Sequence, residues 1–151
     1  MNLVKKATAV DMKIKLSTLW IFAILNYLYC DVLGLTDPNV LRQLISGTGP
    51  IQMTQGFLLG AAILMEIPIA MVLLSRVLKH KANRMANIIA GSIMSAVQIS
   101  TLFVGTPTTY YAFFSIIEIA CTLFIVGYAW RWNRASLPAS ELLADPIDSR
   151  A

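Results

Sequence analysis

Four long apolar segments dominate the sequence and restrict it to a small set of folds. They cover residues 16–35, 55–77, 85–104 and 109–132. Each is long enough to cross about 30 Å of hydrocarbon as an α-helix, which rises about 1.5 Å per residue. A transmembrane β-barrel is not expected, because its strands alternate apolar and polar residues over about ten positions. The sequence therefore predicts an all-α fold, a bundle of four transmembrane helices.

The low content of charged residues agrees with a membrane location. Charged residues make up 13% of the chain, against about 25% in a typical soluble domain, and 57% of the residues are hydrophobic. This composition excludes a disordered chain, a small disulfide-stabilised scaffold and a soluble enzyme of the usual kind. The first apolar segment follows four lysines, as a secretory signal would. It is longer than a signal core of about 7–15 residues and contains Asn26, so we interpret it as a span.

The basic residues are distributed unequally between the two expected sides of the membrane. Eleven of the twelve precede the first span, connect the second to the third, or follow the fourth, whereas Arg42 lies between the first two spans. Lys and Arg concentrate in cytoplasmic segments, so both termini are expected to be cytoplasmic. The pI of 9.3 then reflects topology and contact with anionic membrane lipids, and we expect no nucleic-acid partner.

The expected organisation is a basic cytoplasmic tail over residues 1–15, a membrane domain over 16–132 and a cytoplasmic carboxyl-terminal tail over 133–151. In the first outer loop, Asp37 and Pro38 can start a short helix near 39–45, which Gly47 would end. Its apolar and polar residues lie on different sides, as in a helix lying in the membrane interface. It is either a cap over the bundle or a passive connector.

Each expected span places one amide or carboxyl side chain near the middle of the bilayer. Counted from the first residue of each span, Asn26, Glu66, Gln98 and Glu118 lie about 14–20 Å deep. An acidic residue at the centre of a membrane helix costs at least about 2.5–3.5 kcal/mol, so both Glu side chains are expected to face the interior and have partners. No Lys, Arg or His lies at that depth. At least one of the two carboxyls is therefore expected to be protonated near neutral pH.

This polar layer has two interpretations. It is either a small polar cavity for a proton, a cation or a polar ligand head, or a hydrogen-bonded clasp that holds four helices in register. Tyr27 and Asp31 lie one turn apart in the first span, and Asp31 either receives a hydrogen bond from a tyrosine or faces water. The candidate ligand-binding residues are Glu66, Glu118, Asn26, Gln98, Tyr27 and Asp31.

Patterns typical of other sites are missing from the sequence. His80, the single histidine, lies in a basic link, which argues against haem ligation and a histidine-based metal site. Cys30 and Cys121 are interpreted as free packing thiols, since there is no C-x-x-C pair. No cofactor, metal ligand or catalytic residue is assigned. The small-residue pairs at Gly56 with Gly60 and at Gly91 with Ser95 allow close helix approach, within the bundle or between copies.

Four runs of the sequence resemble a known family. They are K-I-K-L-S-T-L-W (Lys13–Trp20), Y-L-Y-C-D (Tyr27–Asp31), T-Q-G-F-L-L-G (Thr54–Gly60) and E-I-A-C-T-L-F-I-V-G-Y-A-W (Glu118–Trp130). These are similar to an uncharacterised family of short bacterial four-helix membrane proteins, a domain of unknown function related loosely to the DoxX-like proteins. The resemblance covers residues 13–132. It implies the four-helix fold and a bacterial inner membrane, and it supplies neither an activity nor site residues.

The interpretation we favour is a self-associating integral membrane protein whose interior carboxyls bind or move a proton, a cation or a small polar or amphiphilic ligand. Its partners would be membrane lipids and a second copy or another membrane protein. An accessory or assembly subunit with a structural clasp is the alternative. A third is an intramembrane enzyme that uses the two Glu residues as acid and base on a lipid-like substrate. A non-enzymatic role is favoured over this third one.

Overall fold

The computed structural model describes residues 2–49, 51–104 and 106–132, with side chains from residue 10 onward. These residues form five α-helices: α1 (Asn2–Thr36), α2 (Pro38–Ser46), α3 (Gln55–Val77), α4 (His80–Thr101) and α5 (Thr109–Arg131). They contain no strand, so the prediction of an all-α chain is confirmed. The expected carboxyl-terminal tail, 133–151, lies outside the described residues.

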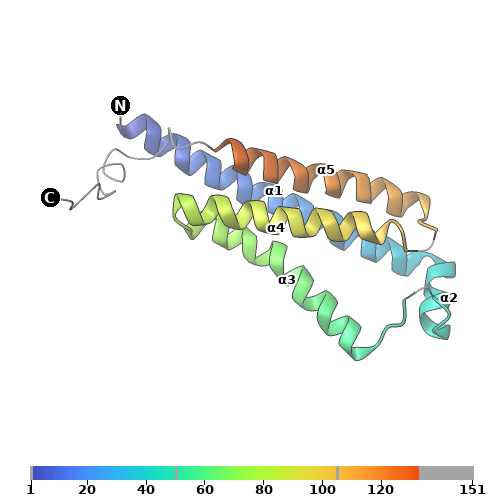
Figure 1. The fold of residues 1–151 in the computed structure, drawn as a ribbon. Helices are drawn as coiled ribbons and strands as arrows, with labels where there is room; N and C mark the ends of the chain where they lie inside the picture. The colour runs from blue at the N-terminus through green and yellow to red at the C-terminus, as the bar shows by residue number, and fades with distance from the viewer. Residues whose placement is uncertain (1, 50, 105, 133–151) are drawn as a thin grey trace.

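Helix α5 lies beside both α1 and α4 (Figure 1). Helix α3 packs against α1 and α4 near its carboxyl-terminal end and diverges from them toward its start (Figure 1). The start of α1 and the end of α5 lie at the same end of the bundle. We call this the basic end, because the basic link around Lys79 lies there, and we call the opposite end the α2 end.

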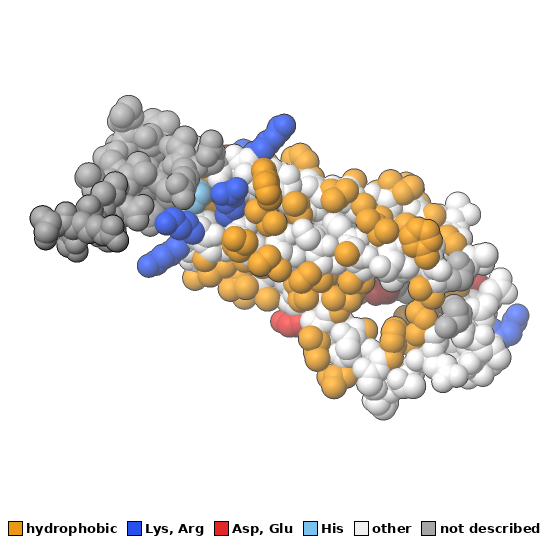
Figure 2. Space-filling view, viewed as in Figure 1, with side chains coloured by type: hydrophobic (Ala, Val, Ile, Leu, Met, Phe, Trp, Pro, Cys, Tyr) orange, Lys and Arg blue, Asp and Glu red, His pale blue; other side chains and the backbone are white. Residues whose placement is uncertain are grey.

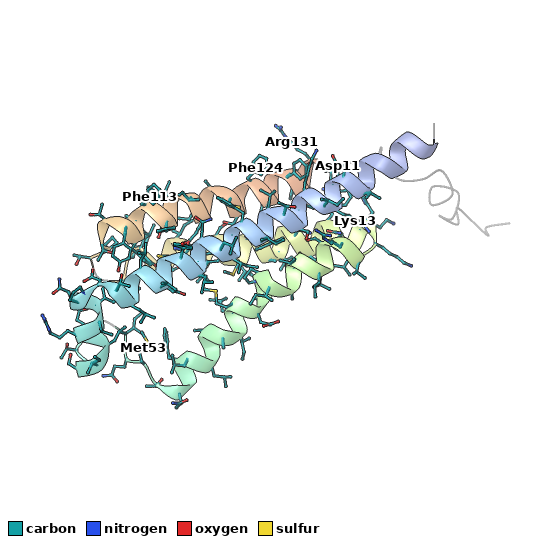
Figure 3. All side chains as sticks on the ribbon, turned by 180° about the vertical axis from the view of Figure 1, so that it is seen from behind. Asp11, Lys13, Met53, Phe113, Phe124 and Arg131 are labelled. Atoms are coloured by element: carbon teal, nitrogen blue, oxygen red, sulfur yellow. The ribbon has the colours of Figure 1, made fainter. Side chains whose placement is uncertain are left out.

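The distribution of side chains is that of a protein surrounded by hydrocarbon. Large apolar side chains cover much of the visible surface (Figure 2). Phe113 and Phe124, for example, project outward from α5 and are 60% and 58% exposed (Figure 3). The buried positions include nine polar residues: Ser17, Ser75, Asn83, Asn87, Ser95, Gln98, Ser115, Glu118 and Thr122. Exposed apolar surface on this scale marks contact with a membrane or another protein.

Three helical segments are long and apolar enough to cross a membrane. They are Val10–Thr36 in α1, all of α3 and all of α5. Helix α1 itself begins at Asn2, before the expected start of the first span, and its 35 residues extend for about 52 Å. These three segments indicate a membrane protein.

Helix α4 is not among the three spans that hydropathy identifies, although the sequence predicts a span over 85–104. Its buried residues include Asn83, Asn87 and Gln98, which lower its mean hydropathy. Its exposed side includes Met85 and Ile89, which are 59% and 52% exposed. The helix is therefore polar where it faces the bundle and largely apolar where it faces outward.

The short helix in the first loop is present and is capped as the sequence predicts. Helix α2 begins after Asp37, whose carboxylate accepts a hydrogen bond from the backbone N–H of Asn39 at 2.9 Å. Gly47 ends it with a φ of 66°, a left-handed conformation that favours glycine. None of the residues of α2 is buried.

A single glycine sets the close approach of α4 and α5. A Cβ atom on Gly91 would lie 2.7 Å from Cγ2 of Val126 and 3.2 Å from the carbonyl oxygen of Thr122. Gly56 and Gly60, by contrast, have open space on α3. The pair of Gly91 with Ser95 therefore allows close packing of α4 inside the bundle, whereas the pair of Gly56 with Gly60 has no close neighbour there.

Candidate functional site

A polar network lies inside the bundle toward its basic end. Asn87 is its centre: its Oδ1 accepts from the indole N–H of Trp20 at 2.8 Å and from the Ser75 hydroxyl at 3.3 Å. The Asn87 amide donates to Oδ1 of Asn83 at 2.7 Å. Asn83 in turn donates to the backbone oxygen of Ser75. The network joins α1, α3 and α4, and its members satisfy one another, which is what a structural clasp requires.

A second contact secures α3 to α1 at this end. The Ser17 hydroxyl donates to the carbonyl oxygen of Val72 at 2.9 Å and accepts from Nε of Arg76 at 3.0 Å. No prediction from the sequence covers these contacts, because their residues lie outside the expected layer of polar side chains near the bilayer midplane. Asn83 and Asn87 lie one helical turn apart, and this spacing is the local signal in the sequence that places both on one side of α4.

The other buried polar region surrounds Glu118, about halfway along α5. The Glu118 side chain is 1% exposed, and neither of its carboxyl oxygens has a hydrogen-bond partner among the described residues. The Tyr27 side chain on α1 is 5% exposed, and its hydroxyl likewise has no partner there. The two groups interact electrostatically across the interface of α1 with α5. The structure therefore brings together Tyr27 and Glu118, two of the expected site residues.

Polar contacts between α4 and α5 continue on both sides of Glu118 without involving its carboxyl group. Gln98 donates from Nε2 to the Ser115 hydroxyl at 2.9 Å. On the other side, the hydroxyls of Ser95 and Thr122 are 2.7 Å apart, and Thr122 donates to the backbone oxygen of Glu118 at 2.9 Å. Gln98, a third expected site residue, is thus buried near Glu118 but is paired with Ser115.

Asp31 lies on the exposed side of the same region. Its side chain is exposed, yet its charge acts on both Glu118 and Cys30. Asp31 follows Ser17 by two steps of seven residues, and each step completes almost two turns of a helix. The two side chains therefore point in directions about 40° apart, and the Ser17 side chain contacts α3. Asp31 therefore faces the side of α1 from which α3 has diverged.

This divergence leaves a gap between α1 and the first half of α3. Residues 52–60 are all exposed, and Figure 2 shows the hollow that lies beside them. Met53, in the link from α2 to α3, lies at the α2 end of this gap (Figure 3). The exposed apolar residues of this half of α3 include Phe57, Leu59 and Ile63. We call this hollow the α1–α3 gap.

The remaining two expected site residues do not join Glu118. Asn26 is half-buried and donates its amide to the carbonyl oxygen of Phe22 in its own helix at 2.8 Å. Glu66 is exposed on α3. The expectation that Glu66 faces the bundle interior is wrong, because Glu66 lies on the side of α3 opposite Leu64 and Pro68, which face the core. The four amide and carboxyl side chains do not form a single layer.

Glu118 and Asp31 have no basic partner among the described residues. Within residues 10–132, as far as they are described, the one ion pair joins Lys15 to Asp11 near the basic end. No described Lys or Arg forms a salt bridge with Glu118 or Asp31. The same residues contain no group of three His, Cys, Asp or Glu side chains that could hold a metal ion. Cys30 and Cys121 are both free and buried.

Comparison with known proteins identifies a family without an activity. The model of a family of unknown function, DUF6326, matches residues 7–139. No curated protein and no solved structure matches the chain.

Proposed function

The chain belongs to the family of unknown function DUF6326, and we propose that it is a membrane protein that binds a polar ligand group at Glu118. The observation that carries this proposal is the Glu118 carboxyl, 1% exposed with no hydrogen-bond partner on either oxygen. Burying a polar group without a partner costs about 1–3 kcal/mol, and more for a charged one. An intramembrane acid of this kind is a functional-site candidate in its own right.

The membrane topology belongs to the same proposal. We take α4 as the fourth span, because its outward side is apolar and its polar residues are buried. The basic residues gather at one end of the bundle, and Arg42 lies at the other, in α2. By the positive-inside rule the basic end is cytoplasmic, with both termini, in the inner membrane of a bacterium. Glu118 and Asp31 then lie toward the outer side.

The two polar regions support different roles. The network around Asn87 pairs its donors and acceptors, so the clasp function is fulfilled at the basic end. Glu118 and Tyr27 leave their functional groups unpaired. Met94 on α4 and Ile125 on α5, each no more than 1% exposed, belong to the apolar core and lie between the two regions along their helices. This apolar layer favours a binding site open to one half of the membrane over a continuous path through the protein.

Native mass spectrometry of the protein extracted from its own membranes tests the proposal. The wild-type protein is expected to retain a small molecule, and E118Q is expected to lose it. E66Q is the matched control, since it makes the same change at an exposed position of another span, and it should retain the molecule. Equal retention by E118Q and the wild type would refute binding at Glu118.

Helix α3 favours a second candidate function, assembly with another membrane protein chain. Glu66 is exposed within an apolar span, and an acid facing lipid is costly. Gly56 and Gly60 leave space on the same helix for a neighbouring backbone. In this candidate a second copy covers α3 and shields Glu66.

The oligomeric state of two glycine variants tests this candidate. G60I fills the open space on α3 and should convert a dimer to a monomer. G127I is the control, because Gly127 on α5 also has open space around it, and it should leave the dimer intact. A wild-type protein that is monomeric in lipid nanodiscs would refute self-association.

A further inference from the structure

We propose that the ligand of the Glu118 site is a lipophilic cation, with its positive head between Glu118 and Asp31 and its apolar tail in the α1–α3 gap. This inference rests on the proposed function and adds the chemical class of the ligand. It follows from three independent features of the site, namely its charge, its aromatic side chains and its opening toward lipid.

The two acidic side chains of the site favour a cationic ligand. Asp31 lies one turn after the buried Tyr27 on α1, which packs against the helix of Glu118, and its charge acts on Glu118. No described Lys or Arg pairs with either acid. Two like charges at short range in a poorly solvated site repel each other. A positive head group placed between them removes the repulsion and supplies the partner that the Glu118 oxygens lack. An anionic head would add to the repulsion.

Tyrosine side chains complete the surroundings of the head group. Tyr27 is buried on α1, which packs against α5, and Tyr111 lies two turns before Glu118 on the same side of α5. Tyr111 is anchored by its hydroxyl, which donates to the Thr101 hydroxyl at 2.6 Å, whereas the Tyr27 hydroxyl has no partner. Aromatic faces attract cations by about 0.5–2 kcal/mol, and aromatic cages are used to bind quaternary ammonium groups. The Tyr27 hydroxyl adds a free polar atom beside the carboxyl.

The α1–α3 gap gives the ligand an apolar compartment and a route. It lies beside a part of α3 with no buried residue over 52–60. Phe57, 41% exposed, lies two turns before Leu64 on the side of α3 that faces the bundle, and Met53 lies at the α2 end of the gap (Figure 3). Asp31 lies on the face of α1 that points toward it. A molecule with an alkyl or aryl tail can thus enter from the lipid, leave its tail among apolar side chains and place its head at the acids. A bare metal ion would use none of this apolar surface.

Binding of three amphiphiles with the same chain tests the inference: dodecyltrimethylammonium, dodecanol and dodecyl sulfate. Each is titrated calorimetrically, at low micromolar concentration, into the full-length protein in nanodiscs of zwitterionic lipid. The cation is expected to bind saturably, and the neutral and anionic probes about tenfold more weakly or not at all. E118Q and D31N should each weaken binding of the cation about tenfold.

Matched variants keep this experiment interpretable. D11N changes another exposed acid of α1, near the basic end, and E66Q changes the exposed acid of α3, so both should bind the cation as the wild type does. D31N replaces an exposed side chain and tests the proposal even if E118Q folds poorly.

The outcomes separate this inference from the proposed function. If dodecanol binds as tightly as the cation and E118Q weakens both, the site binds a ligand but the cationic class is wrong. The inference is also overturned if Ca²⁺ or Mg²⁺ alone displaces the amphiphile from Glu118, or if E118Q and D31N bind the cation as the wild type does. The proposed function fails separately, by equal retention of the co-purified molecule in wild type and E118Q.

Discussion

The indole N–H of Trp20 donates to Oδ1 of Asn87 across 2.8 Å, joining two helices at positions 67 residues apart in the chain. Trp20 is fully buried, and Asn87 is fully buried as well. A hydrogen bond between two buried side chains is strong because water cannot replace either partner. This contact holds the basic end of the bundle closed, while α3 diverges from α1 toward the α2 end.

Replacing Asn87 by Ala should destabilise the protein substantially. The change removes the oxygen that accepts hydrogen bonds from Trp20 and Ser75. It also removes the amide that donates to Oδ1 of Asn83. We expect a loss of about 2–4 kcal/mol in the free energy of unfolding, from several buried groups left unpaired. Thermal unfolding in mild detergent measures it. N26A is the control and should change the stability little, since Asn26 bonds within its own helix.

Trp20 and Asn87 should also be energetically coupled. W20F keeps most of the ring volume and removes the N–H donor. In a double-mutant cycle of W20F with N87A, we expect a coupling energy of about 1–2 kcal/mol. Additive effects of the two substitutions would show that the hydrogen bond does not contribute to stability.

The contact of α4 with α5 should depend on Gly91. G91A brings a Cβ atom to 2.7 Å from Cγ2 of Val126 and 3.2 Å from the Thr122 carbonyl oxygen, so the Val126 side chain or one of the helices must shift. Overpacking of this kind costs about 1–3 kcal/mol, which should appear as a lower Tm. G127A is the matched control on α5, where the added methyl group meets open space. Equal Tm values for the two variants would contradict the packing of α4 against α5.

Continuous apolar runs predicted four helices, α1, α3, α4 and α5, and the all-α class. Mean hydropathy identifies only three of them as spans, since Asn83, Asn87 and Gln98 lower the average of α4 although they are buried. An average over a segment cannot tell a polar residue facing the interior from one facing outward. The spacing of these residues carries that information.

The candidate site could be predicted in part. Depth along a helix correctly drew attention to Glu118, which is buried, and to Tyr27, which lies near it. Depth contains no information about which side of a helix faces its neighbours, so Asn26 and Glu66 were placed in the same layer. Glu66 is exposed because α3 packs on the core through the opposite side, with Leu64 and Pro68, and the choice of that side depends on tertiary packing.

The orientation in the membrane can be tested with single cysteines. In a C30A/C121A background, a cysteine at position 48, in the link after α2, should react with a membrane-impermeant maleimide in intact cells. A cysteine at position 79, between α3 and α4, should react only after the cells are opened. Both native residues, Thr48 and Lys79, are exposed. The reverse pattern of labelling would place the basic end outside.

The most direct test of a ligand site at Glu118 is a cryo-EM map of the wild-type protein, prepared from its own membranes. We predict non-protein density within hydrogen-bonding distance of the Glu118 carboxyl and next to the Tyr27 hydroxyl, continuing into the α1–α3 gap. A map in which the Glu118 carboxyl is bonded to protein groups alone, with no density beside it, would contradict the account.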